Sequence, residues 1–148
     1  MLKKSTKGLA ILLLAITGLS AQAEETQTTL YERLGEWDGI GRIVRDTIAN
    51  HQNNPAISHY FEGVDAEKLA GHVTAFFAAG SGGPSKYAGR DMTTTHANMG
   101  LTDADFDTAV ADVMKAVEKN GIDDTSAAEV AAILESLRPA VMGTGDSG

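Results

Sequence analysis

Histidine is the residue type in this chain best suited to holding a metal ion or moving a proton near neutral pH. The 148 residues contain no cysteine and four histidines, His51, His59, His72 and His96. The absence of cysteine excludes disulfides, thiolate zinc sites, iron–sulfur clusters and cofactor attachment through a Cys-x-x-Cys-His motif. A bound metal would therefore depend on histidine, carboxylate, methionine or tyrosine.

His96 has the most suggestive surroundings of the four. It follows Met92-Thr93-Thr94-Thr95, in a segment without regular periodicity, and Leu101 comes shortly after it. A single histidine is commonly a surface residue or a hydrogen-bonded core residue. Here Met92, His96 and Leu101 flank a loop that faces strongly apolar helices, and neutral imidazole is a good iron ligand. This setting favours a metal-binding role.

His72 precedes Val73 by one position and Phe76 by four, so it lies at the edge of an apolar helix face. It is either a solvated helix-edge residue or a group that reaches over a bound cofactor and onto its iron. A zinc site built on His72 and His96 lacks clear third and fourth ligands. Two histidines across an apolar slot suit a haem better. We interpret His51 and His59 as surface residues.

The elements that position these residues are predicted to be helices, because the apolar spacing is helical nearly throughout and no segment reads as a strand. The first short helix opens at a capping box and stops at a glycine, and further caps mark later helices. The expected elements are a helix from Thr29 to Gly35, one over about 38–52, a turn over 57–61, a helix capped by Asp65, one from Thr102 to Asn120-Gly121, and a last one opened by a box at Ser126–Glu129.

The segment between Gly80 and Thr95 interrupts this pattern. Gly80-Ser81-Gly82-Gly83-Pro84 is a flexible break, and residues 85–95 have no sustained period. Irregular stretches this long inside compact domains usually carry function. The aromatic residues Phe61, Phe76 and Phe77 fit a helical core and the wall of a haem pocket equally well, so periodicity alone does not separate the two.

Residues 1–23 have the features of a secretory signal peptide. Three lysines precede an apolar run over residues 8–19, and Ala21-Gln22-Ala23 is a small-x-small cleavage site. The run is too short to span a bilayer. We therefore expect export, to the periplasm of a bacterium, a mature domain over 24–142 and a flexible tail over 143–148. Removing three lysines and no acidic residue changes the net charge from −8 to −11, which argues against nucleic acid and anionic membranes as partners.

Residues 29–142 resemble the group 1 truncated haemoglobins. The resemblance is carried, in order, by Thr29-Leu30-Tyr31-Glu32-Arg33-Leu34-Gly35, Tyr60-Phe61-Glu62-Gly63-Val64-Asp65, Phe76-Phe77-Ala78-Ala79-Gly80-Ser81-Gly82-Gly83-Pro84, Tyr87-Ala88-Gly89-Arg90-Asp91-Met92, His96, and Gly100-Leu101-Thr102-Asp103-Ala104-Asp105-Phe106. It implies an all-α, 2-over-2 helical sandwich around haem b, with an extended loop in place of most of the proximal helix. His96 would be the proximal ligand. By the same resemblance the haem pocket would be lined by Phe61, Leu69, His72, Val73, Phe76, Phe77, Met92, Leu101 and Phe106, with Tyr87 and Arg90 near the loop and the propionates.

The chain departs from this family on the distal side. Thr47 and Ile48 replace an aromatic pair that ends in a tyrosine, and Leu69 and Val73 occupy positions that are often polar. The family's tyrosine donates a hydrogen bond to oxygen, and losing such a donor removes about 1–3 kcal/mol. This corresponds to oxygen affinity lower by about tenfold to hundredfold. His72 matches the position from which some relatives bind iron as a sixth ligand.

The expected function is reversible binding of a diatomic gas, such as oxygen, nitric oxide or carbon monoxide, by an exported haem protein that is a monomer or weak homodimer. A second hypothesis is a six-coordinate redox haem protein that transfers electrons or turns over nitric oxide or peroxide, with an unidentified reductase as partner. A third is a haem-free helical module that binds a small molecule or a protein in the same pocket.

Overall fold

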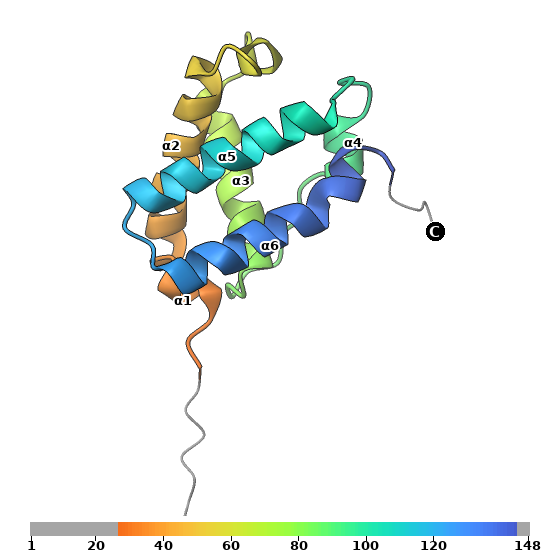
Figure 1. Ribbon diagram of the computed structural model, residues 1–148. Helices are drawn as coiled ribbons and strands as arrows, with labels where there is room; N and C mark the ends of the chain where they lie inside the picture. The colour runs from red at the N-terminus through yellow and green to blue at the C-terminus, as the bar shows by residue number, and fades with distance from the viewer. Residues whose placement is uncertain (1–26, 145–148) are drawn as a thin grey trace, which may run out of the picture.

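A computed structural model describes residues 27–144, and within them every regular element is helical (Figure 1). The expected signal peptide and the last residues of the expected tail lie outside the described residues. None of the helices described is long and apolar enough to cross a membrane. The elements are α1 (Leu30–Arg33), α2 (Glu36–Asn53), the 3₁₀ helix η1 (Ser58–Phe61), α3 (Ala66–Gly80), α4 (Met92–His96), α5 (Asp103–Lys119) and α6 (Asp124–Val141).

Two antiparallel helix pairs form the fold. Helices α2 and α3 make one pair, and α5 and α6 run side by side across them (Figure 1). Helix α2 packs against both α3 and α5, and the short α4 packs against α6. The buried core joins the two pairs, and it includes Ile40, Val44 and Ile48 of α2, Val113, Ala116 and Val117 of α5, and Val130 and Leu134 of α6. The all-α expectation and the 2-over-2 sandwich are confirmed.

Most helix ends lie where the local sequence signals predict them. The Thr29 side chain accepts from the Glu32 amide and the Glu32 side chain accepts from the Thr29 amide, which completes the predicted capping box. The Asp65 side chain accepts from the Lys68 amide at the start of α3. Gly35 and Gly121 have positive φ angles of 85° and 70°, as a left-handed residue at a helix end requires.

The predicted start of the last helix is wrong. The structure caps α6 with Asp123, whose side chain accepts from the Ser126 amide, so Ser126 lies inside the first turn. Ser126 is fully buried, and its hydroxyl donates to Asp123 Oδ2 at 2.7 Å and accepts from Arg33 Nη1 at 2.7 Å. An aspartate one turn earlier thus provides the cap, and Ser126 instead connects α6 to α1.

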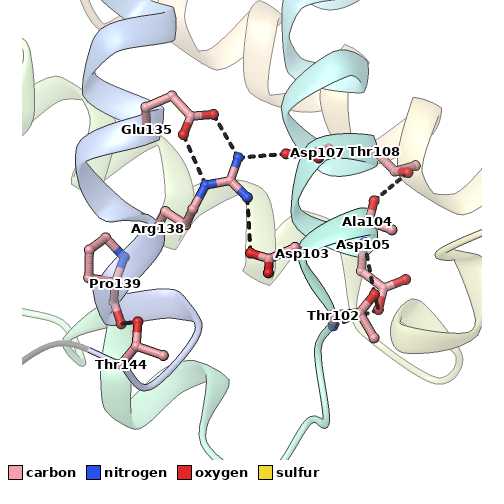
Figure 2. Close-up of polar contacts among 10 residues, drawn as sticks. All are labelled: Thr102, Asp103, Ala104, Asp105, Asp107, Thr108, Glu135, Arg138, Pro139 and Thr144. Carbon is pink, nitrogen blue, oxygen red and sulfur yellow. Dashed lines mark hydrogen bonds and ion pairs between the residues drawn. The ribbon is translucent and has the colours of Figure 1, made fainter.

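Arg138 connects the two helices of the second pair (Figure 2). Its guanidinium donates to Glu135 on α6 and to Asp103 and Asp107 on α5. The same group lies 4.2 Å from the centroid of the Phe106 ring. Hydrogen bonds to Glu135 and Asp107 raise the pKa of Arg138, so the side chain stays charged. This network fixes the end of α6 that packs against α4.

Two helical glycines, Gly39 on α2 and Gly71 on α3, make a matched test of how closely the start of α2 packs against the end of α1. A Cβ atom at Gly39 would collide with the carbonyl oxygen of Leu34, whereas one at Gly71 meets no atom within 4 Å. We expect Gly39→Ala to lower the free energy of unfolding by about 1–3 kcal/mol through overpacking. Gly71→Ala should raise it by up to about 1 kcal/mol through helix propensity. Urea unfolding followed by circular dichroism measures both, and equal effects of the two substitutions would contradict this packing.

Candidate functional site

The segment that carries His96 is more regular than its sequence suggests. Residues 92–96 form the single-turn helix α4, although no sustained period was expected before Thr95. The Asp91 side chain caps this turn, because Oδ1 accepts from the Thr94 amide at 2.7 Å and Oδ2 from the Thr94 hydroxyl at 2.9 Å. A five-residue helix is too short to show a period. The irregular stretch therefore covers only residues 81–91.

The His96 side chain is held by its own helix. Its Nδ1 atom lies 2.8 Å from the carbonyl oxygen of Met92. A carbonyl oxygen only accepts, so Nδ1 must carry the proton and donate it. The lone pair of the neutral imidazole then resides on Nε2. This is the arrangement that a metal-ligating histidine needs, with one ring nitrogen fixed by a backbone carbonyl and the other free to bind.

The irregular segment before α4 is joined to α3 by aromatic contact. The Tyr87 ring meets the Phe76 ring edge-on, with centroids 5.2 Å apart. The Tyr87 hydroxyl donates to the Arg90 carbonyl at 3.0 Å, and the Arg90 side chain is exposed. These contacts place Tyr87 between α3 and the turn that leads to His96. The outward position of Arg90 suits a role at the solvent edge of a pocket.

Most of the other predicted site residues are apolar and only partly buried. Those of this kind are Phe61 on η1, Leu69, Val73, Phe76 and Phe77 on α3, Met92 on α4, and Leu101 before α5. Phe106 is buried beneath Arg138. Phe76 and Phe77 also line an apolar cavity of about 90 Å³ between α1, α3 and α6. Large apolar side chains are usually buried, so a group of partly exposed ones indicates a binding surface.

His72 lies on α3 and its side chain is exposed. Across residues 27–144, no three histidine, aspartate or glutamate side chains are grouped so as to hold a metal ion. His59 is exposed as expected, and its ring lies tilted against the Tyr60 ring, with centroids 4.0 Å apart.

His51 is not the surface residue that was predicted. It is 8% exposed, and its Nδ1 atom lies 3.4 Å from Asp112 Oδ2 on α5. Its ring stacks on Phe61 with centroids 5.1 Å apart and 24° between the planes. Burial lowers the pKa of His51, and contact with Asp112 offsets part of that effect. Its spacing after Thr47 and Ile48 on the inner face of α2 was the available signal.

Asp112 is a buried acid that sequence reasoning missed. Burial raises its pKa, but hydrogen bonds from Asn54, Lys115 and His51 outweigh burial and bring the pKa below its usual value. Asn54 Nδ2 donates to Oδ2 at 2.9 Å and Lys115 Nζ donates to Oδ1 at 3.0 Å. Asp112 therefore stays charged at neutral pH and ties the end of α2 to the middle of α5.

The two α2 residues that replace the family's aromatic pair are both buried. Ile48 belongs to the core, and Thr47 is 8% exposed. In the described part of the chain, the Thr47 hydroxyl is the buried side-chain polar atom without a hydrogen-bond partner. A buried hydroxyl left in this state is costly. No signal in the sequence distinguishes it from a threonine that bonds its own helix.

Comparisons with known proteins agree with this geometry. A family model described as bacterial-like globin matches residues 29–142. The chain is 33% identical to a group 1 truncated hemoglobin of Synechocystis sp. over 110 residues, which cover 72% of this chain and 89% of that protein. The Fe(III) truncated hemoglobin of Tetrahymena pyriformis superposes with a TM-score of 0.73 at 25% identity, covering 77% of this chain and 97% of that one. The 2/2 hemoglobin of a Synechococcus species, solved with covalently attached heme, shares the fold with a TM-score of 0.74 at 24% identity, covering 78% and 99% of the two chains.

The unpartnered hydroxyl gives a prediction about stability. We expect Thr47→Val to raise the free energy of unfolding of the ligand-free protein by about 1 kcal/mol, because valine keeps the shape and removes the buried polar atom. Thr108→Val is the matched control, since the Thr108 hydroxyl donates to the Ala104 carbonyl at 2.7 Å and its removal should bring no gain. Chemical denaturation measures both. A loss of stability in Thr47→Val as large as in Thr108→Val would show that the Thr47 hydroxyl has a partner.

Proposed function

The chain belongs to the bacterial-like globin family and is a haem-binding globin that binds a diatomic gas, and we propose that His96 is its proximal ligand. The observation that carries this assignment is the 2.8 Å bond from His96 Nδ1 to the Met92 carbonyl, which places the lone pair of the neutral ring on Nε2. The His72 side chain is exposed. The His51 side chain is buried, and its Nδ1 atom already contacts Asp112. Among the four histidines, His96 alone has both a fixed tautomer and a position on α4, the short helix that follows the irregular segment.

The residues of the site fit a haem. The partly buried side chains of Phe61, Leu69, Val73, Phe76 and Phe77 offer a flat apolar group the surface it needs. Haem, when bound, provides an iron whose open coordination position takes up a small gas. The protein contributes the axial imidazole, the exclusion of water by apolar walls, and a solvent edge near Arg90 where propionates would meet a guanidinium.

The distal wall proposed here is apolar. Ile48, Leu69 and Val73 occupy positions at which relatives often carry donors, and none of these side chains can donate a hydrogen bond. Oxygen gains more from such a donor than carbon monoxide does, because it becomes more polar when bound. We therefore infer weak oxygen affinity and little discrimination against carbon monoxide.

A six-coordinate redox protein is the second candidate. His72 is exposed on α3, next to Val73 of the distal wall, so packing does not fix its side chain away from the slot. Coordination of iron by His72 would favour electron transfer, or turnover of nitric oxide or peroxide, with a reductase as partner.

We also propose that residues 1–23 direct export to the periplasm, on the strength of their lysines, apolar run and small-x-small site.

Removal of the proximal imidazole tests the central assignment. His96→Gly should lose the absorption spectrum of histidine-ligated haem, and added imidazole should restore it by occupying the vacated position. His59→Gly, which removes an exposed histidine, should leave the spectrum unchanged. Spectra of the ferric and ferrous protein give the answer. An unaltered spectrum in His96→Gly would mean that another residue binds the iron.

Substitution of His72 separates the two candidate functions. If His72 occupies the sixth position, His72→Leu should convert low-spin spectra to high-spin ones. The apparent affinity for carbon monoxide should then rise by the reciprocal of the open fraction, about tenfold for a site that is open a tenth of the time. Rapid-mixing kinetics measure this change, with His59→Leu as control. Identical spectra and kinetics in His72→Leu and the parent protein would eliminate the six-coordinate candidate.

A further inference from the structure

Phe61 rests against a polar group buried inside the protein. The His51 ring lies nearly parallel to the Phe61 ring, at 5.1 Å between centroids. Phe61 ends the 3₁₀ helix η1, a single turn that packs against α2. None of the four η1 residues is buried, and the Phe61 ring is partly exposed. The imidazole beneath it is therefore a contact that can orient the phenyl ring.

The imidazole is in turn fixed from α5. Asp112 Oδ2 lies 3.4 Å from His51 Nδ1, and the same carboxylate is anchored by Asn54 and Lys115. The Asn50 side chain also donates to the Asp112 backbone carbonyl at 3.0 Å. Asp112 is 1% exposed. A buried acid with all of these partners is a rigid support for the tautomer and plane of His51.

We propose that His51 and Asp112 are positioning residues that hold the Phe61 ring against the haem and thereby slow haem loss. The proposal rests on the proposed function, since the contact between Phe61 and haem is taken from the family. His51 acts through Phe61 and does not itself touch the iron. Neither His51 nor Asp112 was among the site residues expected from the sequence.

The pair also makes haem retention depend on pH. The charged groups facing His51 are Asp112 and, beyond it, Lys115 on α5; on η1, His59 is exposed and the Tyr60 hydroxyl donates to Asp105. Burial lowers the pKa of His51, so the opened protein binds a proton more readily than the closed one. The stabilising effect of neutral His51 is complete above about pH 6.5 and decreases as the pH falls toward the lowered pKa.

The rate of haem loss from the full holoprotein is measured by transfer of its haem to a scavenging apoglobin. At pH 8 we expect His51→Leu to lose haem about threefold to tenfold faster than the parent, because the stacking contact is gone. His51→Phe should restore a rate near that of the parent, since it keeps an aromatic ring. As the pH falls from about 6.5 to 5.5, the parent should lose haem progressively faster than His51→Phe does, because His51→Phe has no imidazole to protonate. His59→Phe should follow the parent at every pH.

Two results would overturn the proposal. One is a rate for His51→Leu equal to that of His59→Phe at both ends of the pH range. The other, which would overturn the pH dependence, is a pH profile for His51→Phe that matches the parent. If His51→Leu fails to fold, the profile of His51→Phe alone decides. Failure of the proposed function is distinct, because the parent protein would then bind no haem through His96 and give no transfer to measure.

Discussion

The candidate metal ligand depends on one hydrogen bond within a single helical turn. Helix α4 has five residues, too few to be stable alone, yet it must present the Nε2 atom of His96 in one direction. The bond from Nδ1 to the Met92 carbonyl sets the tautomer, and the Asp91 cap sets the start of the turn. Helix α6 packs against α4, and Arg138 connects α6 to α5 through Asp103 and Asp107. The packing of α6 and α5 thus stabilises a helix that is too short to be stable alone.

The features predictable from the sequence are those whose physical cause lies within a few residues. The capping boxes at Thr29 and Thr102 join side chains and amides three positions apart, so the residue types at these positions are enough to predict the interaction. Helical periodicity gave the all-α class, and the failure of periodicity located the irregular stretch that precedes the candidate ligand. The assignment of His96 and its pocket came from the resemblance, because spacing alone did not separate a haem wall from an ordinary core.

The features that the sequence did not reveal depend on partners far along the chain. The burial of His51 is compensated by Asp112, 61 residues later, whose carboxylate lies 3.4 Å from the ring nitrogen. The burial of Ser126 is compensated by Arg33, 93 residues earlier, which donates to its hydroxyl. His51 and His59 are eight positions apart and look alike in the sequence, yet the inner face of α2 buries the first and the 3₁₀ turn exposes the second. The helical spacing of His51 after Ile48 indicated the inner face of α2, but the polar partner that makes its burial tolerable lies far along the chain.

The proposed apolar distal wall would move the control of iron chemistry to the proximal side. Ile48, Leu69 and Val73 have no hydrogen-bond donor in their side chains, so a wall built of them would select a gas by size and access but not by charge. The electron density that His96 would give to the iron as the proposed proximal ligand then becomes the adjustable property. Its Nδ1 proton is donated to the neutral Met92 carbonyl, not to a carboxylate, and a neutral acceptor makes imidazole less basic than a charged one would. A proximal ligand of ordinary basicity favours reversible binding of a gas over cleavage of an oxygen–oxygen bond, which requires a more electron-rich ligand.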